Sequence, residues 1–214
     1  MPTTLICFAV KEEAAPFQKK SDRFPFAKIL VTGMGRKNSD RAISQRLAEN
    51  PPVLVLTCGF AGALNPDLKI ADVVFDADVD AGISAVLQQS GATLAKFHCA
   101  PRVVITVAEK AALRQSTGAD VVEMESGVIR EICRQRKIPS ATIRVISDTA
   151  HEALPLDFNA LMTADDALSF PKLALALIKS PGKIPRLMQL QKNTRAAAQA
   201  LAQMLEKLLS RRSR

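Results

Sequence analysis

The chain has 214 residues, of which 48% are hydrophobic and 23% charged, and its formal net charge is +8. This composition supports one domain with a sizeable core, and no apolar run approaches the length of a membrane span. Four well-separated cysteines without a Cys-x-x-Cys pair or a histidine at ligand spacing argue against disulfides and against a zinc or other metal site, so we expect reduced thiols in a cytoplasmic protein.

Short β-branched runs alternate with helical patterns as far as residue 148, which is typical of a mostly parallel sheet flanked by helices. The predicted strands cover residues 5–10, 29–32, 53–58, 73–75, 103–107 and 141–146. The predicted helices begin near Lys11 and cover residues 39–49, 108–115 and 126–136. The sequence therefore predicts a single α/β domain over residues 1–214, with a mixed, mostly parallel sheet.

The pattern changes after Asp148. Residues 151–166 are typical of a loop, and helices are predicted over 171–179 and 186–209, the second with an apolar stripe. From residue 170 to 214, ten Lys and Arg residues stand against Glu206 alone. This basic helical C-terminal segment has two interpretations: an ordinary helix packed on the sheet, or a helix that rests on an anionic membrane surface.

Three acidic clusters lie where strands end, which is where α/β sheets bind ligands. They stand in Lys11-Glu12-Glu13 after the first strand, in Glu123-Met124-Glu125 before a helix, and in Ser147-Asp148 after the last strand. A glycine-rich segment, residues 58–63, follows the third strand and is interpreted as a turn that lets backbone approach a ligand. Taken singly, each cluster is also typical of a solvated face or a helix cap.

The order and wording of these segments resemble the purine nucleoside phosphorylase and methylthioadenosine/adenosylhomocysteine nucleosidase family. The resemblance rests on AVKEE at 9–13, GFAGALNPDLKIAD at 59–72, EMES at 123–126 and SATIRVISDTA at 140–150. AEKAAL at 108–113, STGADVVEMES at 116–126 and residues 177–201 are similar to its short hopanoid-associated phosphorylase branch. That branch implies removal of adenine from an adenosine-bearing hopanoid lipid.

The resemblance implies an N-ribosyl hydrolase or phosphorylase with a nucleoside phosphorylase-like fold. Asp148 would be the acid that protonates the purine, and Glu13 would orient and deprotonate the attacking water. Glu125 would accept hydrogen bonds from the ribose, and Met124 would pack against the sugar. The other implied substrate contacts are Glu123, Phe60, Ala61, Gly62 and Ser147. Arg144 is interpreted as the partner of a structural salt bridge beneath the site.

Two segments depart from the family pattern. Family phosphorylases hold phosphate with Ser or Arg near the glycine segment, whereas this chain has Thr57 and Phe60 there. Gly35 and Arg36, just before a predicted helix, are an alternative anion site for phosphate as a co-substrate. Hydrolysis is therefore favoured. Residues 107–110 lack the aromatic ring that covers the purine in family nucleosidases. The stretch between Phe75 and Glu123 is also shorter than in the family's larger members, which suits an open site and a substrate with a bulky tail.

Two other classes of function stay open. A nucleic-acid binder would use the basic tail, although the chain has no Tyr or Trp for base stacking. A catalytically silent nucleotide-binding protein would keep the fold and explain the altered residues at 57, 60 and 107–110. We expect a small nucleoside as the partner, no cofactor, no bound nucleic acid, and a homo-oligomer that acts in the cytoplasm or at the inner face of the membrane.

Overall fold

The computed structural model describes residues 3–163 and 169–212. Within these residues, eight strands form a mixed sheet in the order β2-β1-β3-β8-β4-β5, and β7 joins β3 to β6 outside this path. Five of the seven pairings in the described chain are parallel, and the β3–β7 and β4–β8 pairings are antiparallel. The strands are β1 (Thr4–Phe8), β2 (Ala27–Val31), β3 (Leu54–Ala63), β4 (Val73–Ala77), β5 (Thr93–Leu94), β6 (Phe97–Cys99), β7 (Val121–Glu123) and β8 (Ser140–Asp148).

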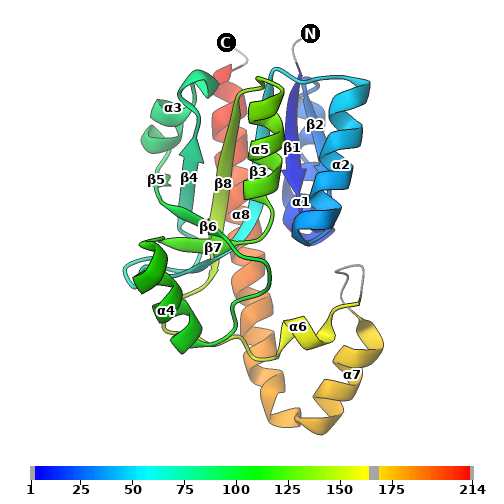
Figure 1. The fold of residues 1–214 in the computed structure, drawn as a ribbon, viewed down its shortest axis with the longest axis vertical. Helices are drawn as coiled ribbons and strands as arrows, with labels where there is room; N and C mark the ends of the chain where they lie inside the picture. The colour runs from blue at the N-terminus through cyan, green and yellow to red at the C-terminus, as the bar shows by residue number, and fades with distance from the viewer. Residues whose placement is uncertain (1–2, 164–168, 213–214) are drawn as a thin grey trace.

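Helices cover both faces of this sheet (Figure 1). Helices α1, α3 and α8 pack on one face, where the largest apolar cluster lies, and α2 and α5 pack on the other. Alternating strand residues feed the two clusters: Ile6 and Phe8 point to the first, and Leu5 and Cys7 point to the second. The helices are α1 (Lys11–Gln18), α2 (Gly35–Glu49), α3 (Ser84–Gln89), α4 (Val107–Thr117), α5 (Ser126–Gln135), α6 (Phe158–Leu161), α7 (Phe170–Lys179) and α8 (Ile184–Arg212).

The two halves of α8 have different surroundings. The second half is an ordinary core helix, because its apolar residues from Ala197 to Leu209 are buried against the sheet. The first half extends beyond the end of the sheet and lies beside α6 and α7 (Figure 1), and Met188 is exposed there. No helix in the described ranges combines the length and apolarity needed to cross a bilayer.

The predicted strand over residues 103–107 is wrong. Residues 103–106 lie outside any strand, and Val107 begins α4. The backbone of Val103 bonds to the side chain of Asn159, and the carbonyl of Ile105 accepts the amide of Leu154. The β-branched residues that favour a strand here are held by loop contacts instead of by a neighbouring strand.

Other boundaries shift in ways that matter for the site. Helix α2 begins at Gly35 and not at Ser39, whose hydroxyl is buried and donates to Thr32 Oγ1. The glycine-rich segment 58–63 is strand and not turn, because β3 continues to Ala63 beside β8. Strands β5, β6 and β7 and helices α3 and α6 were not among the predicted elements.

Candidate active site

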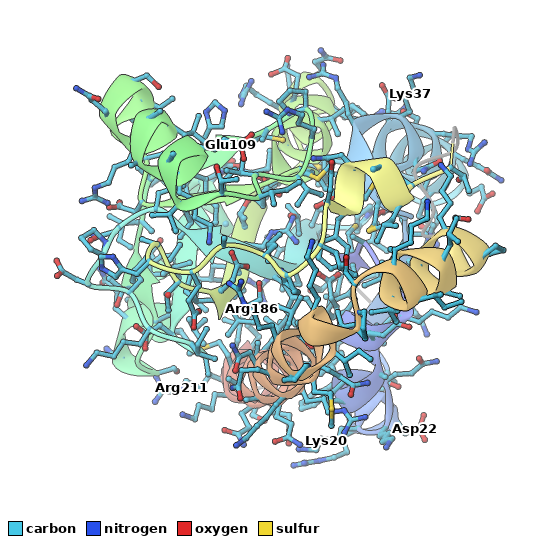
Figure 2. All side chains as sticks on the ribbon, turned by 90° about the horizontal axis from the view of Figure 1, so that it is seen from below. Lys20, Asp22, Lys37, Glu109, Arg186 and Arg211 are labelled. Atoms are coloured by element: carbon cyan, nitrogen blue, oxygen red, sulfur yellow. The ribbon has the colours of Figure 1, made fainter. Side chains whose placement is uncertain are left out.

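Strands β1, β3 and β8 run parallel, so their carboxyl ends meet at one edge of the sheet. Figure 2 looks at this edge from below, with α7 and the first half of α8 in front of it and Arg186 near the centre of the view. Glu13 lies on α1 just after β1, Glu125 directly precedes α5, and Asp148 ends β8. The fold therefore brings three predicted site residues to the same edge.

Arg144 of β8 is the buried cation beneath this edge, with a side chain that is 2% exposed. Its Nη2 lies 2.6 Å from Glu123 Oε2 and 3.5 Å from Glu125 Oε2. Burial lowers the pKa of Arg144, but Glu123, Glu125 and Glu13 more than offset this and raise it above its usual range. Arg144 is thus part of a buried ion-pair network, as its interpretation as a structural salt bridge predicted.

Gly59, in the middle of β3, occupies a position with no space for a side chain. A Cβ at this position would meet Arg144 Nη1 and the carboxylate of Glu13. The missing side chain leaves the space in which Arg144 and Glu13 approach each other across the strand. Gly59 therefore allows two side chains to approach each other closely, and it does not form the predicted turn.

Glu123 is held as a structural carboxylate, and its contact with substrate stays a prediction. Its side chain is almost fully buried, and both oxygens are occupied within the protein. Oε2 accepts the amides of Glu125 and Ser126 as well as Arg144, and Oε1 accepts the Ser126 hydroxyl. Burial raises the pKa of Glu123, but Arg144 and these hydrogen bonds outweigh it, so the pKa is lower than usual. Glu123 binds the start of α5 and neutralises Arg144.

Glu125 is placed differently although it is only two residues away. It precedes α5 but makes no side-chain cap, so the alternative interpretation of Glu125 as a helix cap does not hold. Its Oε1 accepts the amide of Gly35, at the start of α2, at 2.9 Å. Burial raises the pKa of Glu125, Arg144 lowers it, and the neighbouring Glu123 and Glu13 raise it again, to about 7. Glu125 thus changes its charge near neutral pH.

The carboxylate of Glu13 accepts hydrogen bonds from three backbone amides. Oε2 accepts Ala9 N at 2.9 Å and Val10 N at 3.2 Å, and Oε1 accepts Phe60 N at 2.8 Å. Burial raises the pKa of Glu13, and this effect exceeds the lowering by Arg144 and the amides. A carboxylate with a raised pKa is a better base than an exposed one.

Asp148 has a hydrogen-bond donor on each carboxylate oxygen. The Ser147 hydroxyl donates to Oδ1 at 2.7 Å, and Lys110 Nζ donates to Oδ2 at 2.5 Å. Gly62 of β3 lies opposite, where a Cβ would be 3.0 Å from Oδ2. No helix begins directly after Asp148, and the next one, α6, starts only at Phe158, so its alternative interpretation as a helix cap does not apply. The Asp148 side chain is 11% exposed and lines a cavity of about 200 Å³.

Lys110 is the residue that the sequence analysis missed. It lies on α4, is buried, and contacts Asp148 directly. A lysine on a surface helix is ordinarily exposed, and residues 107–110 drew attention only because an aromatic ring is missing there. No local pattern indicates that this ammonium turns inward.

The remaining predicted site residues take several positions. Met124 is half-buried between its two glutamates, and Ala61 is buried with its carbonyl 3.4 Å from the Ser147 hydroxyl. Phe60 lines a groove of about 720 Å³ between α1 and α8. Arg36 is exposed on the first turn of α2. The amide of Gly35 is engaged by Glu125, so it is not available to the predicted anion site in this arrangement.

Thr57 cannot take the place of a phosphate-binding residue. Its side chain is buried in β3, and its hydroxyl lies 3.2 Å from Arg144 Nη2. It belongs to the layer of polar side chains under the site. His151, by contrast, is exposed and lines a separate cavity of about 500 Å³ beside α4.

Comparison with known proteins identifies the family. A family model described as the phosphorylase superfamily matches residues 74–210, which is more than half of the chain. The 5'-methylthioadenosine/S-adenosylhomocysteine nucleosidase of Shewanella pealeana is 24% identical over 167 residues, which cover 61% of this chain and 73% of that protein.

Solved structures share the fold. Futalosine hydrolase of Helicobacter pylori has a TM-score of 0.73 at 16% identity, and the match covers 98% of each chain. The 5'-methylthioadenosine/S-adenosylhomocysteine nucleosidase of Colwellia psychrerythraea, solved in complex with adenine, has a TM-score of 0.72 at 17% identity and covers 98% of this chain and 95% of that one. The predicted α/β fold and the predicted enzyme family are confirmed. The chain belongs to the phosphorylase superfamily.

Proposed function

We propose that this protein breaks the N-glycosidic bond of an adenosine modified at its 5′ carbon and releases adenine. The observation that carries the proposal is the placement of Glu13, Glu125 and Asp148 at one sheet edge, with Glu13 and Glu125 beside the buried Arg144 and Asp148 paired with Lys110. Relatives named as methylthioadenosine/adenosylhomocysteine nucleosidases support this class of substrate.

Asp148 protonates the leaving base. A purine departs poorly as an anion, so the reaction needs an acid within hydrogen-bond reach of the ring. Asp148 is held on both oxygens and has its exposed part in a cavity, which gives the carboxyl a fixed direction. In the protonated form it donates its proton to the purine nitrogen as the bond to the ribose breaks.

Glu125 stabilises the ribose while positive charge develops on it. As a carboxylate it accepts hydrogen bonds from the sugar hydroxyls, and these bonds strengthen as the sugar becomes electron-deficient. Met124 packs its thioether against the sugar. Glu13 takes a proton from the attacking water, which its raised pKa favours, and the resulting hydroxyl completes the free ribose.

Hydrolysis is favoured over phosphorolysis. Thr57 is occupied by Arg144, Phe60 offers no side-chain donor, and the Gly35 amide is held by Glu125. These contacts leave the exposed Arg36 as the cation of the predicted anion site. Phosphate stays as an alternative co-substrate that would have to displace Glu125 from Gly35.

The 5′ substituent is proposed to be bulky and apolar, as in an adenosine-bearing hopanoid lipid. This part rests on the sequence resemblance and is supported by an apolar groove of about 420 Å³ between Phe158, α7 and the first half of α8. Ile178 on α7 is 77% exposed, and the exposed Lys179 and Lys183 follow it in the chain. We propose that α7 and the first half of α8 rest on the anionic inner face of the membrane. We also propose that the protein acts as a homo-oligomer in the cytoplasm.

One assay tests the reaction. Release of adenine from 5′-substituted adenosines is measured with and without phosphate, using the wild type, Asp148→Asn and the exposed control Asp22→Asn. We expect release without phosphate, a loss of about 10²–10⁴-fold in Asp148→Asn, and no change in Asp22→Asn. A phosphate requirement would favour phosphorolysis, and no release from any substrate would favour a catalytically silent protein.

A second assay tests the membrane surface. Flotation with anionic and with zwitterionic vesicles compares the wild type with Ile178→Ser/Met188→Ser and with Val79→Ser, which lies in an exposed turn after β4. We expect binding to anionic vesicles that the double variant loses and the control keeps. Equal behaviour of all three proteins would contradict the membrane part of the proposal alone.

A further inference from the structure

The ammonium of Lys110 is fully occupied by the protein. Its Nζ lies 2.5 Å from Asp148 Oδ2, 2.6 Å from the Thr149 carbonyl and 2.9 Å from the Glu152 carbonyl. A lysine ammonium has three N–H donors, so each donor has an acceptor. The side chain is 1% exposed. Lys110 therefore acts on a ligand only through the groups that it holds.

Those groups form the acid and part of the wall beside it. The turn from Thr149 to Glu152 is closed by Glu152 N donating to the Thr149 carbonyl at 3.2 Å, and the Glu152 carboxylate accepts the Thr149 hydroxyl. Asp148 and Glu152 line the same cavity of about 200 Å³, with Leu154 and Arg186. One ammonium thus binds the carboxylate of Asp148 and the backbone of the turn that follows it.

Two donors from different elements fix the plane of the Asp148 carboxylate. Ser147 of β8 holds Oδ1, and Lys110 of α4 holds Oδ2. Without Lys110, the carboxylate would keep one donor and could rotate about its Cβ–Cγ bond. A proton transfer depends steeply on the position of the acid relative to the acceptor atom, so this rotation would lower the rate.

We propose that Lys110 is a positioning residue, which locks the Asp148 carboxyl and the 149–152 turn in the single arrangement that presents the acid to the leaving base. The proposal rests on the proposed function and adds to it a residue from the segment 107–110, where the chain departs from the family pattern. In the step itself, Asp148 enters as the neutral carboxyl and gives its proton to the purine as the C–N bond breaks. It is left as the carboxylate that pairs with Lys110, which keeps its three protons.

The leaving group separates positioning from plain structure. Lys110→Met is measured with 5′-methylthioadenosine, whose purine needs a proton, and with 4-nitrophenyl riboside, whose phenolate leaves without one. We expect kcat with the adenosine to fall about 10²-fold at a nearly unchanged KM, and the riboside rate to change far less. Lys96→Met is the control, because the ammonium of Lys96 also donates to a backbone carbonyl, that of Thr117, but Lys96 is exposed and its ammonium does not hold the Asp148 carboxylate.

Lys110→Arg is a conservative variant that separates a loss of positioning from a failure to fold. It keeps a cation and is expected to recover part of the adenosine rate, and urea unfolding of each variant shows that the folded state is measured. Equal losses on both substrates, or no loss on the adenosine, would overturn the positioning role. If the wild type itself releases no adenine, the proposed function fails first, and the role of Lys110 fails with it.

Discussion

Two buried clusters of charge lie at the same sheet edge and differ in their balance. In one, Arg144 faces three carboxylates, those of Glu13, Glu123 and Glu125. In the other, Lys110 faces only the carboxylate of Asp148, and its remaining N–H groups donate hydrogen bonds to two backbone carbonyls. The first cluster has more anions than cations, and the second is paired one to one.

The difference in balance separates two chemical tasks. Burial raises the pKa of Glu13, and burial together with the neighbouring Glu123 and Glu13 brings the pKa of Glu125 to about 7. These groups gain and lose protons easily, which suits a base and a pH-sensitive sugar ligand. The Lys110–Asp148 pair instead fixes geometry, which suits the direction of a proton transfer.

Removing Arg144 is expected to have the largest effect. Arg144→Met leaves three buried carboxylates without their cation, and breaking a buried pair in this way costs about 3–5 kcal/mol of unfolding free energy. Urea unfolding at pH 7 measures the loss. Arg130→Met is the matched control, because Arg130 pairs with Asp76 and Asp78, which are both partly exposed. Equal losses in the two variants would show that the three-carboxylate cluster has no special cost.

Glu125 is expected to give the next effect, as a dependence of stability on pH. Its pKa is about 7 in the folded protein against an ordinary 4.5, so between these values the folded state binds more protons than the unfolded state. Its contribution to the unfolding free energy is complete below pH 4.5 and is lost as the pH rises through 7. In Glu125→Gln this decline in unfolding free energy should disappear. In the control Glu12→Gln, which changes the exposed glutamate next to Glu13, the decline should stay.

The same titration gives a signature in activity. Glu125 accepts the ribose hydroxyls as a carboxylate, so kcat/KM of the wild type is expected to rise with pH through about 7. A profile of kcat/KM measured between pH 5 and pH 9 checks this, with those limits chosen roughly two units either side of the titration. A flat profile would contradict the role of the ionised Glu125.

The fold could be predicted because it depends on local signals, and the three carboxylates of the site could be predicted because those signals stand beside a resemblance to a known family. Short β-branched runs mark strands, and acidic residues directly after parallel strands meet at one edge whatever lies between them. This rule applies to Glu13 and Asp148, whereas Glu125 follows β7, which is antiparallel to β3, and was predicted from its resemblance to the family's Glu-Met-Glu motif. The error at 103–107 has the opposite origin, since strand propensity is local while pairing with a neighbour is not.

The division of roles within the site could not be predicted. Glu123 and Glu125 are both glutamates in one short motif, and only the position of Arg144 and of the first turn of α5 decides which of them is a structural anion. Lys110 was missed for a similar reason. Its partners are a side chain and two carbonyls nearly forty residues away, and nothing near it in sequence indicates them.

A surface cluster of charges is expected to give the smallest change in unfolding free energy. It tests whether burial or unequal numbers of charges makes a cluster sensitive to substitution. Glu206 of α8 lies between Lys20 and Arg23, so here too the charges are unbalanced, but its side chain is 18% exposed and its partners are largely exposed. Glu206→Gln is expected to change the unfolding free energy by about 1 kcal/mol or less, and by less still in high salt. If it cost as much as Arg144→Met, unequal numbers of charges alone would explain the fragility of a cluster. A small cost means that burial, and not the number of charges, makes the cluster around Arg144 depend on its cation and raises the pKa values of Glu13 and Glu125.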